Sequence, residues 1–463
     1  MHPSFRTLPV LTLLLLFSGA LHAQELSDHP DIAAYSGEAQ RIIDAAMSDE
    51  ESFEELTWFG DHFGPRFSGS ESLERSIDWI VEEMRADGFD RVWTQEVMVP
   101  HWVRGEESAA LLAPREKDLP MLGLGGSVGT PEGGIRAEVL VVESFEDLKA
   151  RSDEAGGKIV LYDVPFTSYG QTVRYRTQGA IEAARAGAVA SLVRSVGPYS
   201  MQTPHTGNSS YEEGVPRIPH AAITLEDAAM LHRMQERGER IEIRLEMDAE
   251  TLPDVPSRNV IAEIRGSERP EEIVVLGGHI DSWDVGQGVM DDAGGCLAAW
   301  EALKIMKELG LQPRRTVRVV LWTNEENGLR GANAYRDMVV EDGTVDDHVL
   351  AMESDSGVFE PRGFGFSGSD AAWEMVAAVG SLLAPIGSDA VTRGGGGADI
   401  GPIMQEGVPG MGLSVDGSRY FWYHHSAADT IDKLNAEDYK KCIATMAVMA
   451  YVVADMPRTL PRE

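Results

Sequence analysis

Residues 273–299 read IVVLGGHIDSWDVGQGVMDDAGGCLAA, in which an apolar strand, a polar loop and the start of a helix follow one another. The apolar run from Ile273 to Leu276 predicts a strand that is buried on both faces. Apolar residues then recur at helical spacing from Ala293 to Leu309, and Gly310 predicts the end of that helix. A strand followed in this way by a helix is typical of α/β proteins.

The same alternation continues on both sides of this stretch. Apolar patterns predict strands at 259–264, 317–323 and 349–352, and an apolar helix at 437–454 closes the chain. Strands that alternate with helices favour parallel pairing, with helices packed on each side. We therefore expect an α/β fold whose sheet is mixed, mostly parallel and covered by helices on both faces.

A smaller unit interrupts this pattern. Strands are predicted at 138–142, 159–164 and 187–193, with a helix at 180–186. The alternation of apolar strands and helices that is typical of the main unit resumes near Ser257. A chain of 463 residues is longer than one hydrophobic core usually serves. We expect a main domain formed by residues 24–111 and 256–463, with a smaller α+β domain inserted at 112–255.

The N-terminus has the features of a secretory signal peptide over residues 1–23. Arg6 precedes the apolar run 8–17, and small residues follow it. That run is much shorter than the roughly 20 residues needed to cross a bilayer. We expect an exported protein, periplasmic or extracellular, with no membrane anchor after signal cleavage.

Composition bears on partners and on redox state. The formal net charge is −35, and an acidic surface repels phosphate, so we expect no nucleic-acid partner. The two cysteines, Cys296 and Cys442, lie in apolar helical patterns, which are typical of buried thiols. One disulfide between them remains compatible with an oxidising compartment.

Residues that bind metals follow three of the predicted strands. The strand ends run into Gly277-Gly-His-Ile-Asp281, Thr323-Asn-Glu-Glu326 and Met352-Glu-Ser-Asp355. In open α/β sheets, sites form at the carboxyl ends of the strands. Asp291 and Asp292 open the next helix, and a His-His pair lies in the segment 423–430. Imidazole and carboxylate ligands without thiolate predict a catalytic zinc site.

The motifs GGHIDSWDVGQGVMDDAGG, TNEENGLRGA, MESDSG and YHHSAADT together resemble those of the co-catalytic di-zinc aminopeptidase family. They are most similar to its plasma glutamate carboxypeptidase (carboxypeptidase Q) branch. Segments 179–195 and 216–224 resemble the protease-associated domain that this branch carries as an insertion. The resemblance implies two Zn²⁺ per chain, short peptide substrates and a homodimer.

The resemblance also implies a role for each residue of the site. Asp291 is expected to bridge the two zinc ions, with His279 and Asp355 on one ion and Glu326 and His425 on the other. His425 is chosen over His424 because the last ligand of the family stands four residues before the Asp of an Asp-Thr pair, here Asp429-Thr430. Glu325 is then the general base.

Two further residues receive roles with less support. Asp281 is expected to accept a hydrogen bond from the second ring nitrogen of His279, as carboxylates behind metal-bound histidines do. His424 stands where some relatives carry a tyrosine that stabilises the tetrahedral oxyanion, so it is a candidate substrate contact. A packed loop histidine is an equal alternative for His424.

These observations predict a secreted di-zinc exopeptidase that hydrolyses short peptides or dipeptides. Two alternatives use the same fold: a glutaminyl-cyclase-like transferase with a single zinc, and a receptor-like binding protein without catalysis. Every expected ligand lies outside residues 115–252, so we expect zinc binding to be independent of the smaller domain. Within that domain, Asn208-Ser-Ser210 forms a glycosylation sequon.

Overall fold

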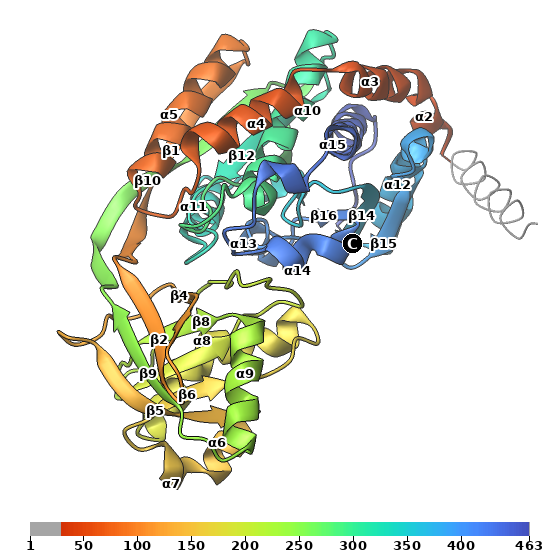
Figure 1. The fold of residues 1–463 in the computed structure, drawn as a ribbon. Helices are drawn as coiled ribbons and strands as arrows, with labels where there is room; N and C mark the ends of the chain where they lie inside the picture. Colours follow the sequence, from red (N-terminus) through yellow and green to blue (C-terminus); the bar gives the residue numbers. More distant parts are fainter. Residues whose placement is uncertain (1–28, 463) are drawn as a thin grey trace, which may run out of the picture.

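The computed structural model describes residues 29–462, so the predicted signal peptide lies outside the described residues. Figure 1 shows two lobes, each built around its own sheet and joined on one side by a pair of long strands. The small lobe comprises residues 107–247, and the main lobe comprises the described residues before and after it. Among the described helices, none is long and apolar enough to cross a membrane.

The main lobe contains an eight-stranded sheet in the order β1-β10-β12-β11-β13-β16-β14-β15. Four of its seven pairings are parallel, and three of these are adjacent in the centre, from β12 to β16. The sheet is therefore mixed, with a parallel centre and antiparallel additions. Its strands are β1 (Arg91–Val103), β10 (Glu250–Ile264), β11 (Arg269–His279), β12 (Arg315–Trp322), β13 (His348–Glu353), β14 (Pro361–Ser367), β15 (Ala390–Arg393) and β16 (Gly410–Val415).

Helices cover both faces of this sheet, as the apolar strand patterns predict. The longer helices of the main lobe are α3 (Ser36–Ser48), α4 (Ser52–Phe63), α5 (Glu71–Ala86), α10 (Gly294–Glu308), α11 (Arg330–Glu341), α12 (Asp370–Gly380) and α15 (Ala436–Asp455). Shorter ones are α2 (Pro30–Ala33), α13 (Gly401–Gln405) and α14 (Tyr420–Tyr423).

Strand β11 shows how the two faces are filled. Val274 and Leu276 belong to the large core that also contains α10 and α15. Ile273 and Val275 point to the opposite side and join the core beneath α11 and α13. This alternation explains why the strand has no polar face, and it fixes His279 at the end of a rigid, fully covered element.

The small lobe contains a second eight-stranded mixed sheet, in the order β3-β2-β9-β5-β6-β7-β8-β4. Its strands are β2 (Glu107–Ala113), β3 (Lys117–Leu119), β4 (Met121–Gly123), β5 (Ile135–Val142), β6 (Ile159–Tyr162), β7 (Ala190–Arg194), β8 (His220–Ile223) and β9 (Glu242–Met247). Its helices are α6 (Phe145–Ala150), α7 (Ser152–Ala155), α8 (Tyr169–Arg185) and α9 (Leu225–Glu236). Separate apolar clusters fill its two faces.

The junction between the lobes differs in detail from the expected boundaries. The predicted limits of the inserted unit, 112 and 255, fall inside β2 and β10. β1 and β10 run antiparallel to one another and pair as far as Val103 with Glu250. The chain thus leaves the main lobe and returns to it on neighbouring strands (Figure 1). Cys296 and Cys442 are both free and buried, as their apolar surroundings predict.

Candidate metal centre

The three strands that run into His, Glu and Asp residues are neighbours in the sheet. β12, β11 and β13 pair in parallel, so their carboxyl ends lie along the same edge. His279 is the last residue of β11, Glu325 and Glu326 follow β12, and Asp355 follows β13. The structure therefore brings together the residues that the strand pattern predicts at this edge.

His279 is buried and its ring orientation is fixed from both sides. Its Nδ1 donates to the carbonyl oxygen of Asp281 at 2.8 Å, which turns Nε2 towards the carboxylates of the site. Nε2 lies 3.2 Å from Oδ1 of Asp291 and 3.3 Å from Oδ1 of Asp355. One imidazole nitrogen and two carboxylate oxygens thus converge on one point.

Asp291 and Asp292 do not form a regular helical turn. Both have non-helical backbone angles just before α10, and the peptide bond between them is cis. The carboxylate of Asp292 accepts hydrogen bonds from the backbone N–H of His279 at 3.2 Å and of Gly295 at 3.1 Å. Asp292 therefore caps the helix and ties it to β11, which leaves Asp291 to face the site.

Asp291 presents its two oxygens to two different groups. Oδ1 faces His279, and Oδ2 lies 3.5 Å from Nε2 of His425. The same Nε2 lies 3.0 Å from Oε2 of Glu326. The backbone of Asp291 is held by Asp429, whose carboxylate accepts from the N–H groups of Met290 and Asp291. The five expected ligands thus form two clusters that share Asp291.

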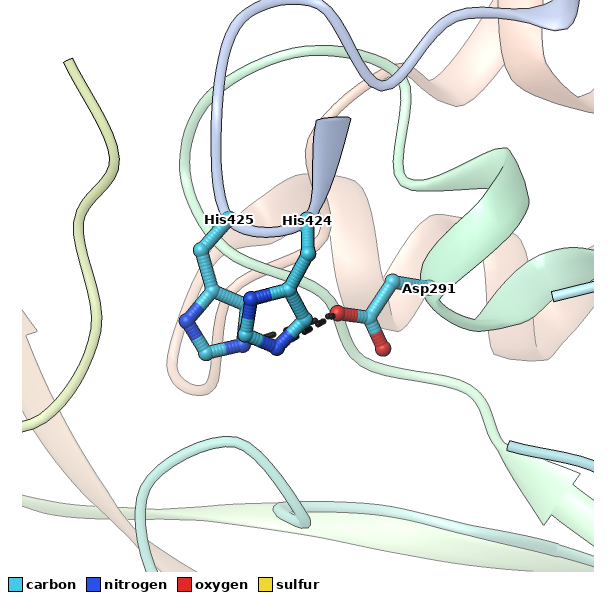
Figure 2. A group of neighbouring side chains, drawn as sticks. All are labelled: Asp291, His424 and His425. Carbon is cyan, nitrogen blue, oxygen red and sulfur yellow. Dashed lines mark ion pairs between the residues drawn. The ribbon is translucent and has the colours of Figure 1, made fainter. Parts of the chain in front are cut away.

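The two histidines of the His-His pair lie close together. Figure 2 shows their rings one above the other beside Asp291, and the ring centroids are 3.5 Å apart with an interplanar angle of 18°. Nε2 of His424 lies 3.6 Å from Oδ2 of Asp291, nearly as close as His425. In the described part of the chain, only His425 of this pair also forms an ion-pair contact with Glu326. Burial lowers the pKa of His424 to about 3, so its imidazole is neutral.

The position of Asp281 corrects one expectation. The acceptor for Nδ1 of His279 is the backbone carbonyl of Asp281, while the nearest carboxylate oxygen is 4.0 Å away. The carboxylate instead accepts from the backbone N–H groups of Glu325 at 3.0 Å and Glu326 at 3.3 Å. A carboxylate can satisfy two backbone donors at once, whereas one carbonyl is sufficient for one imidazole N–H. Asp281 therefore positions the acidic pair.

Arg66 organises the loop between His279 and Asp291, a role that the sequence pattern does not indicate. Its guanidinium is fully buried and donates to four backbone carbonyls, at 2.7–2.9 Å: those of Gly64, Ile280, Gln287 and Gly288. Three of these carbonyls belong to the loop. The side chain of Arg66 therefore fixes the course of the loop that brings His279 and Asp291, twelve positions apart, into contact.

The electrostatics of the cluster favour a bound cation. Burial and the nearby carboxylates raise the pKa of Glu326 well above its usual value, and burial raises that of Asp355. Burial also raises the pKa of Glu325 to about 8, with His279 opposing and Asp355 adding to the shift. Among the described residues, Oδ2 of Asp291 and Oε1 of Glu326 are buried without a hydrogen-bond partner. Buried carboxylate oxygens of this kind fit a metal with oxygen and nitrogen ligands.

A cleft opens above the metal centre. Its volume is about 390 Å³, and it is lined by Tyr169, Arg176, Asp291, Glu325, Glu326, Asp355, Ser356, Gly417, Tyr420, Phe421, His424 and His425. Tyr169 and Arg176 come from α8 of the small lobe, and neither belongs to a motif that the sequence pattern singles out. A cleft of this size is at the lower end of the range for small-molecule sites, about 300–1,000 Å³.

The small lobe also contacts the loops that carry the expected ligands, although none of those ligands lies within it. Thr206 donates its backbone N–H to the carbonyl of His425 at 2.8 Å. The side-chain amide of Asn208 donates to the carbonyl of Glu326 at 3.1 Å. The asparagine of the sequon is therefore engaged at the site. His205 contacts the carbonyl of His424 at 2.7 Å.

Comparison with known proteins identifies relatives over almost the whole chain. Residues 259–450 match Peptidase family M28. Carboxypeptidase Q from Mus musculus is 49% identical over 435 residues, which cover 93% of this chain and 92% of that protein. The crystal structure of a peptidase M28 precursor from Shewanella amazonensis SB2B covers 93% of this chain and 100% of its own, with a TM-score of 0.88 and 35% identity. A zinc aminopeptidase from Bacillus subtilis shares the fold at 20% identity, with a TM-score of 0.67 over 89% of this chain and 97% of its own.

These relatives decide between the classes of protein that the sequence left open. The matched span contains β11, β12 and β13 with their His, Glu and Asp residues, and the 49% identity extends through the small lobe as well. Neither a transferase nor a protein without catalysis is supported by them. The chain belongs to peptidase family M28 and is a zinc metallopeptidase.

Proposed function

We propose that this metallopeptidase is an exported exopeptidase that holds two zinc ions and removes single residues from short peptides. The observation that carries the proposal is the division of the site around Asp291. One carboxylate oxygen faces His279 and Asp355, and the other lies on the side of Glu326 and His425. A carboxylate shared in this way is the arrangement expected of a two-metal hydrolase.

His279 and Asp355 would hold one ion, Glu326 and His425 the other, and Asp291 both. Zinc ions held there would supply an acidified water and polarise the scissile carbonyl. Glu325 lines the cleft beside this cluster and is held by Asp281 through its backbone N–H. Its carboxylate takes the proton of the attacking water and returns it to the leaving amine.

His424 supports the oxyanion in this proposal. Its Nδ1 is buried and has no hydrogen-bond partner among the described residues, although the ring lines the cleft. A neutral imidazole has one N–H to donate, and an oxyanion that forms during amide hydrolysis is a strong acceptor. Tyr169 and Arg176 of the small lobe narrow the cleft, which supports short substrates. In this proposal the lobe is a protease-associated domain.

The acidic pair provides the test. Glu325→Gln should retain about two zinc ions per chain and lower kcat by roughly 10²-fold or more, because general-base catalysis contributes about 10²–10⁴-fold. Glu326→Gln should lose metal as well as activity. Zinc is counted by elemental analysis, and activity is measured on dipeptides. Full activity in Glu325→Gln, or a single zinc in the wild type, would show that the proposed mechanism is wrong.

A further inference from the structure

We infer that Arg176 of the small lobe binds the α-carboxylate of the residue that leaves after hydrolysis, so that the enzyme selects substrates with one residue beyond the scissile bond. This inference rests on the proposed function. It assigns a specificity-determining residue on the lobe that does not carry the metal ligands.

The guanidinium of Arg176 is buried without a compensating acid. The residue is 5% exposed, yet no carboxylate of the described residues lies within ion-pair distance of it. Nη1 donates to the carbonyl of Thr206 at 3.2 Å, and Nη2 donates to the hydroxyl of Tyr169 at 2.7 Å. The Nε–H is buried and has no partner in the described part of the chain. Burying an uncompensated cation is costly, so a carboxylate supplied by the ligand would offset that cost.

The surroundings of the guanidinium are built to hold it in place. Its Cζ lies 5.4 Å from the centre of the Tyr169 ring, which covers one of its faces. Gly207 approaches so closely that a Cβ there would lie 2.2 Å from Nη1 and 2.3 Å from Cζ. Any larger residue at this position would displace the guanidinium. A rigid, oriented fork is the form in which arginine recognises a carboxylate.

The charge pattern of the cleft fits a short zwitterionic peptide. Among the described residues that line the cleft, Arg176 is the only arginine or lysine, whereas Asp291, Glu325, Glu326 and Asp355 are acidic. Bound zinc would compensate the negative charge of these four carboxylates through coordination or proximity. The positive charge of Arg176 would remain without a partner. The ammonium end of a peptide is attracted to the acidic side, and its carboxylate to the guanidinium.

The position of Arg176 limits the leaving group to one residue. Nη1 lies 3.3 Å from Nδ1 of His425, and Nε2 on the far side of that ring contacts Glu326 at 3.0 Å. The guanidinium therefore contacts one proposed metal ligand, and a single imidazole ring separates it from the proposed metal position. Successive Cα atoms are about 3.8 Å apart, so the carboxylate of a single leaving residue falls within this range, and each further residue moves it away by about 3.5 Å.

The test compares a dipeptide with its C-terminal amide. For the zinc-loaded wild type, kcat/KM should favour the free acid by at least about 10-fold, the effect of a buried charged hydrogen bond. Arg176→Met should lower kcat/KM for the free dipeptide by about that factor more than for the amide, so that the preference disappears. Arg176→Lys should retain part of it. Arg174→Met is the matched control, because Arg174 is exposed on the same helix.

Each outcome separates the inference from the proposed function. An equal loss on both substrates, with loss of zinc, would mean that Arg176 only supports His425 and would overturn the inference. An unchanged preference in Arg176→Met would overturn it as well. If that variant does not fold, Tyr169→Phe removes one contact of the guanidinium and should lower the preference several-fold. A wild type that keeps its zinc but cleaves neither peptide would contradict the proposed function itself.

Discussion

Replacing Arg66 with methionine tests how the metal centre is assembled. The change removes four hydrogen bonds to backbone carbonyls that are buried between α4 and the loop after β11. Each buried carbonyl left without a donor costs about 1–3 kcal/mol. Even at the lower limit, the four together predict a loss of about 4 kcal/mol in the free energy of unfolding.

The loss should appear in two measurements on zinc-loaded protein. The urea midpoint, followed by tryptophan fluorescence, should fall, and zinc should transfer to a chelator faster because the loop no longer holds His279 and Asp291 in register. Arg66→Lys separates charge from geometry, because lysine keeps the positive charge but lacks the planar guanidinium. We expect Arg66→Lys to show more than half of the destabilisation of Arg66→Met. Arg265→Met, a change at an exposed arginine, is the control. A midpoint and a zinc-transfer rate equal to those of the wild type in Arg66→Met would refute this account of the loop.

Three further predictions concern packing, pH and metal. Gly278→Ala should lower zinc content and solubility, because its Cβ would lie 2.1 Å from Oδ2 of Asp292. Gly37→Ala, at an exposed position in the first turn of α3, meets nothing within 4 Å and should instead stabilise the protein by up to about 0.5–1 kcal/mol. Burial lowers the pKa of His348 from 6.5 to about 4, so stability should fall as pH drops through that window, on the order of 3 kcal/mol in total; His348→Gln should flatten this part of the urea-midpoint profile. Chelator treatment should abolish dipeptide hydrolysis and lower the thermal midpoint, and zinc should restore both; activity that survives complete metal removal would contradict a metal-dependent mechanism.

The sequence predicts those parts of the site that depend on the main sheet. His279, Glu326 and Asp355 follow apolar strands, and parallel strands bring their carboxyl ends to one edge, so a local pattern is enough to place them. The presence of helices on both faces of the sheet is also predictable from the sequence, because the central strands are apolar on both sides. A mixed sheet was expected, but the positions of its antiparallel pairings, β1–β10, β10–β12 and β14–β16, could not be predicted, since pairing direction depends on connections that the local pattern does not contain.

The contribution of the small lobe could not be predicted in this way. Arg176 lies in the middle of an ordinary helical pattern, and Asn208 belongs to a sequon that suggests a different role. Their contacts with His425 and Glu326 join residues separated by 249 and 118 positions. Only the packing of the lobes creates these contacts. A glycine such as Gly207, where a side chain would collide with Arg176, gives a signal that is visible only once the neighbour is known.

The pairing of Val103 with Glu250 has a consequence for how such enzymes diverge. A segment whose two ends emerge side by side can be gained, lost or exchanged without rerouting the rest of the chain. In this protein the exchanged segment would take Arg176, Thr206 and Asn208 with it. A new lobe would therefore change the residues that face the substrate cleft and the support of the metal-binding loops in one event.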